Sequence, residues 1–121
     1  MKRNLELIRH ILIVREESEK DRLYAEDFVT DVYSEKDVSG HIELLLDCGF
    51  IEAIRFNALG RAYPDFWVKR ITMSGYEYLD SVRDPGIWDA VKQKLGKFAN
   101  SVTLDVVQAA AAQIIKAKIG I

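Results

Sequence analysis

Apolar residues recur at intervals of three and four in several stretches of the chain, which is the spacing of an amphipathic helix. The clearest of these stretches runs over residues 34–48. Its apolar stripe consists of four residues: Val38, Ile42, Leu45 and Leu46. Ser34 and Asp37 form a capping-box variant at the start, and Gly49 suits the end because glycine adopts the left-handed conformation at little cost. The pattern therefore predicts a helix with defined ends.

The same spacing predicts further helices, and two apolar runs predict strands. The helices are expected over Leu5–Glu17, Met73–Arg83, Ile87–Leu95 and Leu104–Lys118. The strands are expected over Ile51–Phe56 and Phe66–Ile71, and the turn residues of 57–65 join them in a connection too long for a tight hairpin. Residues 23–33 fit either two turns of helix or a short strand, because β-branched and aromatic residues are frequent there.

The order helix, glycine, strand, connection, strand, helix is that in which a winged helix passes from its recognition helix into its wing. We therefore expect an α+β, mostly helical protein with a winged helix-turn-helix-like domain and a small antiparallel β-wing. Any other helix-turn-strand unit is the alternative. Since Asp84-Pro85 interrupts the helical pattern, the domain is placed at residues 1–84. Residues 85–121 form a C-terminal helical extension that packs on the domain or on a partner subunit.

Composition narrows the functional classes. A chain of 121 residues with 49% hydrophobic content suits one domain with a short extension. The formal charge of −2 and pI of 5.7 do not suit a protein that coats nucleic acid. Cys48 is the single cysteine, which excludes an internal disulfide and a multi-cysteine zinc site, and its apolar helix favours a buried, inert thiol. Charged residues interrupt the first apolar stretch, so no signal peptide or membrane span is predicted, and the cytoplasm is the expected location.

Three segments of the chain resemble a known family. They read MKRNLELIRHIL, YSEKDVSGHIELLLDCGFIEA and RITMSGYEYLDSVRDPGIWDAVKQKL, and a helical tail follows them. Together they resemble an uncharacterised bacterial and prophage family, a domain of unknown function with a winged-helix-like fold. The resemblance implies that fold, a bacterial or phage origin and, by analogy, transcriptional regulation. One departure is Gly40, where the family commonly has an aromatic residue, and glycine there loosens the helix by roughly 1 kcal/mol relative to alanine.

The charge pattern favours the wing over the helix as a surface for duplex DNA. A recognition helix reads bases with Arg, Lys, Asn or Gln, but residues 34–48 hold one lysine against four acids, which would repel phosphate. The usable contacts on this helix are Lys36, Ser39 and His41. The wing holds four cations against Asp65 alone, namely Arg55, Arg61, Lys69 and Arg70. Ordinary solvated charges are the alternative, and so is a winged-helix module that binds a protein partner without DNA.

The last predicted helix is apolar around most of its girth. Its widest face carries Leu104, Val107, Ala111, Ile114 and Ile115. A small domain can cover only one side of such a helix, so we expect a homodimer through this face. The alternative is a tail buried wholly within its own chain.

No enzyme, metal or cofactor is predicted from the sequence. The chain has no phosphate-binding glycine loop, nucleophile elbow or paired catalytic acids with a supporting histidine. His41 with Glu43 or Cys48 does not have the ligand number and spacing of a metal site.

Overall fold

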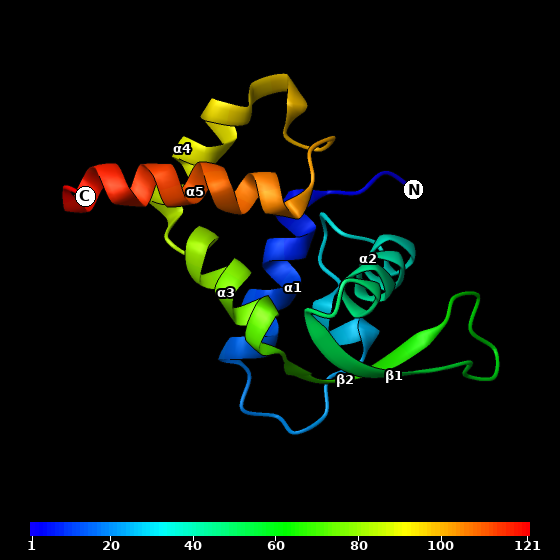
Figure 1. Ribbon diagram of the computed structural model, residues 1–121. Helices are drawn as coiled ribbons and strands as arrows, with labels where there is room; N and C mark the ends of the chain where they lie inside the picture. Colours follow the sequence, from blue (N-terminus) through cyan, green and yellow to red (C-terminus); the bar gives the residue numbers. More distant parts are fainter. The chain divides into compact units, whose positions relative to one another are not determined.

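The computed structural model describes residues 1–121 and confirms an α+β, mostly helical chain (Figure 1). It forms two compact units, Met1–Tyr76 and Glu77–Ile121, which divide within helix α3 (Met73–Val82). The boundary expected from the sequence lies a few residues later, at the end of that helix. No helix is both long enough and apolar enough to cross a membrane.

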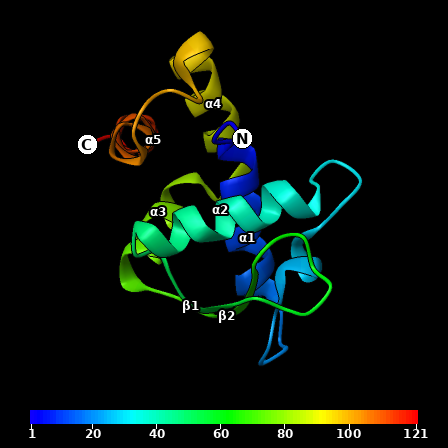
Figure 2. The ribbon, with the colours of Figure 1, turned by 90° about the vertical axis from the view of Figure 1, so that its right-hand side faces the viewer.

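In the first unit, α1 (Leu5–Glu17) and α2 (Glu35–Asp47) pack across one another (Figures 1 and 2). Polar side chains cap both helices at the start. The Asn4 side-chain oxygen accepts from the backbone N–H of Glu6 at 2.9 Å, and Ser34 Oγ accepts from that of Asp37 at 3.2 Å. These caps satisfy amide groups that have no partner within the helix. The predicted starts of both helices are confirmed.

The wing is an antiparallel hairpin of β1 (Ile51–Phe56) and β2 (Asp65–Ile71). Ile51 faces Ile71 and Ile54 faces Trp67, with a bulge between Glu52 and Ala53. Side chains alternate between the two faces of a strand, so Ile51 and Ile71 point to the core while Ile54 and Trp67 lie on the outer face. The predicted wing is confirmed, and β2 begins one residue earlier than expected.

Residues 23–33 form neither a second α-helix nor a full strand. Leu23 makes an isolated bridge to Val68, whose N–H donates to the Leu23 carbonyl at 2.9 Å. One turn of 3-10 helix follows, η1 (Ala25–Phe28). The buried carboxylate of Asp65 accepts from the backbone N–H of Ala25 at 3.1 Å. The structure of this segment therefore depends on its contacts with β2, and its local propensities alone did not determine it.

The core of the first unit lies among α1, α2 and the inner face of the hairpin. Its fully buried apolar side chains include Leu7, Ile8, Ile11, Leu12, Phe28, Val38, Ile42, Leu45, Phe66 and Val68. The stripe predicted for α2 is buried at Val38, Ile42 and Leu45, while Leu46 lies at its margin. Helical spacing thus identified three of the four predicted stripe residues as buried.

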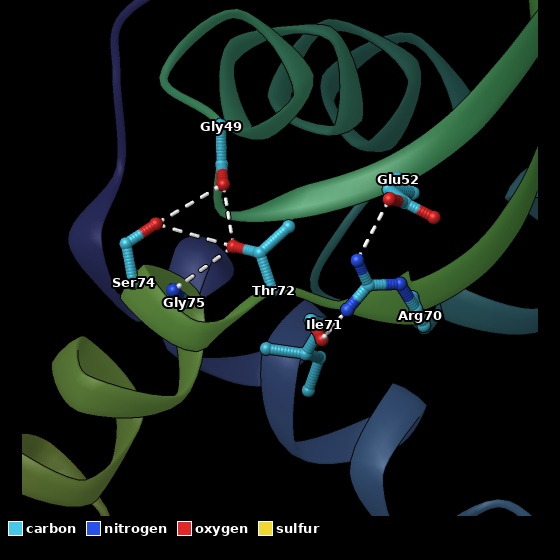
Figure 3. A network of polar contacts seen from close by, with 7 residues as sticks. All are labelled: Gly49, Glu52, Arg70, Ile71, Thr72, Ser74 and Gly75. Carbon is cyan, nitrogen blue, oxygen red and sulfur yellow. Dashed lines mark hydrogen bonds and ion pairs between the residues drawn. The ribbon is translucent and has the colours of Figure 1, made fainter.

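A polar junction joins the end of α2, the start of β1 and the first turn of α3 (Figure 3). Gly49 adopts a left-handed φ of 77° after α2, and the hydroxyls of Thr72 and Ser74 both donate to its carbonyl. Thr72 Oγ1 also accepts from the Gly75 N–H at 3.2 Å. A side-chain carbon at Gly75 would overlap the carbonyl oxygen of Phe50, so only glycine fits at this approach.

The second unit contains the remainder of α3, then α4 (Pro85–Leu95), the short η2 (Gly96–Phe98) and α5 (Leu104–Ile119). Asp84 caps α4 by accepting from the Ile87 N–H at 2.9 Å. Helices α4 and α5 pack against each other, and Lys94 Nζ donates to Gln113 Oε1 across them at 2.7 Å. The predicted C-terminal helices are confirmed.

Two glycine-to-alanine changes in helices should have opposite effects on stability. Gly75→Ala places a methyl group against the Phe50 backbone, which cannot move freely, so we expect a loss of about 1–3 kcal/mol. Gly40→Ala in α2 meets only the flexible side chain of Met1, so relief of the glycine penalty should leave stability unchanged or raise it by up to about 1 kcal/mol. Urea unfolding of both variants would check this, and equal effects would contradict the close approach at Gly75.

Candidate interaction surface of helix α2 and the wing

Of the three helix residues expected to contact DNA, only Lys36 is exposed. Ser39 is 4% exposed, and its hydroxyl donates to the Pro64 carbonyl at 2.8 Å. His41 is 1% exposed. The expectation that Ser39 and His41 present themselves to a ligand is therefore wrong. The polar side chains at these positions bind the protein's own backbone.

His41 holds the start of α1 against α2. Its Nδ1 lies 2.7 Å from the Asp37 carbonyl, and its Nε2 lies 2.8 Å from the Asn4 backbone nitrogen. Because the Asn4 N–H can only donate, Nε2 is the acceptor and Nδ1 carries the proton of a neutral ring. Burial lowers the pKa of His41, and the Asp37 carbonyl and carboxylate oppose that shift while Arg3 adds to it. The histidine is a structural hydrogen-bonding residue.

Two wing arginines form ion pairs with acids of the same chain. Arg55 Nε lies 3.1 Å from Glu43 of α2. Arg61, in the connection between the strands, contacts Glu35 at the start of α2 at 2.9 Å and Glu26 of η1 at 3.6 Å. These ion pairs connect the wing to helix α2. A ligand that approaches either arginine also meets a carboxylate.

Arg70 has a partner within the hairpin itself. Its guanidinium donates to Glu52 at 2.7 Å across the strands (Figure 3). This hydrogen bond lowers the pKa of Glu52 and raises that of Arg70. All three wing arginines are thus paired with carboxylates.

The fourth wing cation, Lys69, lies over an aromatic ring. Its Nζ is 4.7 Å from the ring centroid of Trp67, and the guanidinium of Arg22 is 4.6 Å from the same centroid. Sequence reasoning missed Arg22, because its charged surroundings resembled a solvated turn. The position of Trp67 beside these cations was likewise not indicated by the sequence. The bridge of Leu23 to β2 explains why Arg22 comes close to the wing.

The five residues predicted to form a dimer interface on α5 are not equally accessible. Val107 and Ala111 are fully buried within the chain, while Leu104, Ile114 and Ile115 are partly exposed. The centre of the predicted face is therefore already covered within the chain, whereas the alternative of a wholly buried tail is not met, because the margins are partly exposed. Homodimerisation through α5 stays a prediction that concerns the margins of this face.

Cys48 is exposed at the end of α2, so its predicted burial is wrong. Its thiol nevertheless donates to the Leu45 carbonyl at 3.5 Å, and desolvation of the sulfur raises the pKa of the thiol. A raised pKa lowers the thiolate fraction, so weak reactivity is still expected. No group of three or more His, Cys, Asp or Glu side chains is arranged to hold a metal ion.

These features define a winged-helix-like protein whose helix α2 is acidic and whose wing arginines are internally paired. The chain belongs to the family described as "Hypothetical protein (DUF2513)", whose profile matches residues 2–103. A Haemophilus influenzae protein named "Uncharacterized protein" is 34% identical over 116 residues, covering 95% of this chain and 96% of that protein. Membership of a bacterial domain-of-unknown-function family, inferred from the three segments, is confirmed.

A solved structure described as "Crystal Structure of a transcriptional regulator" matches 89% of this chain and 76% of its own, with a TM-score of 0.40 and 18% identity. A likeness of this degree supports no conclusion on function. The function is therefore inferred from the geometry of this chain's own residues.

The buried His41 makes stability depend on pH. Its pKa is lowered from the ordinary 6.5 in the folded protein, so the unfolded chain binds the proton more readily. The free energy of unfolding should therefore fall as pH drops below 6.5, down to the folded pKa. His41→Gln does not titrate and should show a shallower fall between pH 7.5 and 5.5 in urea unfolding.

The pairing of Glu52 with Arg70 affects stability in a separate, lower pH range. Because the pKa of Glu52 is lowered in the folded protein, the stability that this pair contributes is lost only as the pH falls below 4.5. An NMR titration of the His41 ring provides a second measurement on the wild-type protein. Identical slopes for the two proteins, or a His41 pKa at or above 6.5, would contradict the assigned role.

Proposed function

We propose that this is a winged-helix regulatory protein that acts in the cytoplasm by binding another protein, not by reading DNA, and without an enzymatic step. The observation that carries the proposal is the pairing of every wing arginine with a carboxylate of the same chain. Exposed ion pairs of this kind contribute little stability. Their effect here is on recognition, because the acids place negative charge where phosphates would bind.

The charge of the winged-helix unit supports the same proposal. Residues 1–76 contain 11 Lys and Arg against 14 Asp and Glu, a formal charge of −3. DNA-binding domains gain most of their affinity by releasing counterions from phosphates through exposed cations. A unit with this balance lacks the long-range attraction that such binding uses.

Helix α2 also lacks the side chains that read bases. Ser39 and His41 are buried, which leaves Lys36 as the single exposed candidate of the three. Glu35, Glu43 and Asp47 carry negative charge on the same helix. Base edges in the major groove are read mainly by Arg, Lys, Asn and Gln, and one lysine cannot specify a site.

Duplex DNA bound through the wing is the second candidate. The observation that favours it is that Lys36 and Lys69 are both exposed and neither has a carboxylate partner. A prophage origin and a role in transcription, which the family resemblance implies, accord with either candidate. The two candidates differ in what happens when the acids are neutralised.

Fluorescence anisotropy with a random duplex at about 50 and about 200 mM salt separates them. We expect no binding by the wild-type protein at the higher salt. The triple variant Glu35→Gln, Glu43→Gln, Glu52→Gln frees Arg55 and Arg70 and leaves Arg61 only its longer contact with Glu26, so it should gain salt-sensitive binding. Glu77→Gln, Asp80→Asn, Asp89→Asn, which removes the same charge from the second unit, is the matched control and should gain less.

The opposite result would establish the DNA candidate. In that result, the wild-type protein binds the duplex and its affinity falls steeply as the salt concentration rises. The double variant Arg61→Ala, Lys69→Ala loses this binding for all DNA sequences alike. Equal affinity of wild type and that double variant would exclude the wing as the DNA-binding surface.

We also propose that the protein pairs with a second copy through the margins of the α5 face. Leu104 and Ile115 are partly exposed there, and Ile119, on the same side of the helix, is 65% exposed. Apolar side chains at such spacing gain from burial against a partner helix. The buried centre at Val107 and Ala111 limits the area that this contact can add.

Light scattering at tens of micromolar tests the pairing. The intact protein should be dimeric, and Ile119→Lys should make it monomeric by placing a charge in the contact. Ala109→Lys, exposed on the opposite side of α5, is the matched control and should remain dimeric. A monomeric wild-type protein, or a dimeric Ile119→Lys variant, would exclude this interface.

A further inference from the structure

The outer face of the hairpin is an aromatic and aliphatic surface with cations at its margin. Ile54 and Phe56 lie two residues apart on β1 and therefore share a face, and Trp67 stands opposite Ile54. Ile54 is 46% exposed and Phe56 37% exposed. Tyr24 adds a ring edge-on to Phe56, with centroids 6.2 Å apart. We call these four side chains, together with Arg22 and Lys69, the outer wing face.

Arg22 and Lys69 differ from the wing arginines in having no carboxylate partner. Both are exposed, and both lie against the ring of Trp67. Glu52 is close enough for Lys69 to lower its pKa, but its carboxylate binds Arg70. Two like charges against one ring repel each other, and an anion placed beside them would remove that repulsion. The outer wing face is therefore the part of the wing that still lacks a counter-charge.

The indole nitrogen of Trp67 is a second unsatisfied group at this face. Trp67 Nε1 is shielded from solvent and has no acceptor within the chain. A buried N–H donor without an acceptor carries a cost that a new hydrogen bond removes. A ligand acceptor that reaches this nitrogen, after the side chains over it shift, would satisfy it. The two unpaired cations and this N–H donor would therefore all be satisfied by a ligand oxygen that carries negative charge or accepts a hydrogen bond.

We propose that the outer wing face binds an extended segment of a partner protein in which every second residue is in turn acidic and bulky apolar, so that both kinds of side chain lie on one side of the segment. This inference deepens the proposed function and rests on it. Carboxylates of the segment would pair with Arg22 and Lys69, and its apolar side chains would cover Ile54 and Phe56. An extended segment fits because its every second side chain points to the same side, as on β1, so acidic and apolar residues spaced by two can both reach this face.

A nucleic acid suits this surface less well. Both cations already lie on the Trp67 ring, so a base would have to displace them in order to stack. A phosphate backbone has nothing apolar to place over Ile54 and Phe56, which would remain exposed. A peptide with both carboxylates and apolar side chains satisfies the charge and covers the apolar surface together.

The test uses the full chain and the indole N–H signals of its two tryptophans in 15N NMR spectra. The probe is a blocked peptide, Glu-Ser-Leu-Ser-Asp-Ser-Phe-Ser, which places its acidic and apolar side chains on one side when extended, added to millimolar concentration. One control peptide has Lys at each acidic position, and another has Ala at each apolar position. A random duplex and a single-stranded oligonucleotide are added in parallel. Trp67→Phe assigns the Trp67 signal.

We expect the acidic apolar peptide to shift the Trp67 signal and leave that of Trp88 in place. Arg22→Gln, Lys69→Gln should weaken this binding about tenfold, since two charge contacts are lost. Lys116→Gln, Lys118→Gln removes the same charge from exposed positions of α5 and should bind the peptide as the wild type does. Both control peptides should bind more weakly than the probe.

Failure of this inference is distinguishable from failure of the proposed function. No shift of Trp67 by any peptide, or equal shifts by the acidic and the Lys-containing peptides, overturns the inference. If the duplex is also inactive, the proposed function still stands and the partner binds elsewhere. A Trp67 shift produced only by duplex or single-stranded DNA overturns both.

Discussion

The close approach between the Phe50 backbone and the first turn of α3 determines how the wing is attached. Gly75 permits it by having no side chain, and the hydroxyls of Thr72 and Ser74 bind the neighbouring Gly49 carbonyl. These contacts fix where β1 leaves α2 and where β2 returns to α3. The register of the hairpin, and hence which residues face outward, follows from those two fixed ends.

Electrostatic pairing then divides the wing into two surfaces. The side toward α2 is internally neutralised, because Arg55 and Arg61 bind acids of α2 and η1. The outer side keeps cations that are supported by an aromatic ring and have no carboxylate partner. The hairpin thus has one side whose cations are paired with carboxylates of the same chain and another side whose cation has no carboxylate partner. This explains how an acidic protein can still present a local positive surface.

The sequence predicted the helices, both strands and the α2 stripe, because periodicity and caps are local properties. It could not predict partners that are remote in sequence. Ser39 looked exposed, since nothing nearby indicates that the Pro64 carbonyl lies beside it. His41 was misplaced for the same reason, because its acceptor role depends on the Asn4 amide. Residues 23–33 remained open because their conformation depends on pairing with β2. Counting charges along the chain likewise could not predict that the wing arginines pair with acids that are remote in sequence.

The placement of the two tryptophans has an optical consequence. Trp67 belongs to the first compact unit and Trp88 to the second. Trp67 is partly exposed beside two cations, whereas Trp88 is buried at 3% exposure. Intrinsic tryptophan emission therefore comes from one ring in each half of the chain, in different surroundings. Replacing either ring by phenylalanine leaves a protein whose tryptophan fluorescence follows a single unit, so the cooperativity between the units can be measured without any attached label.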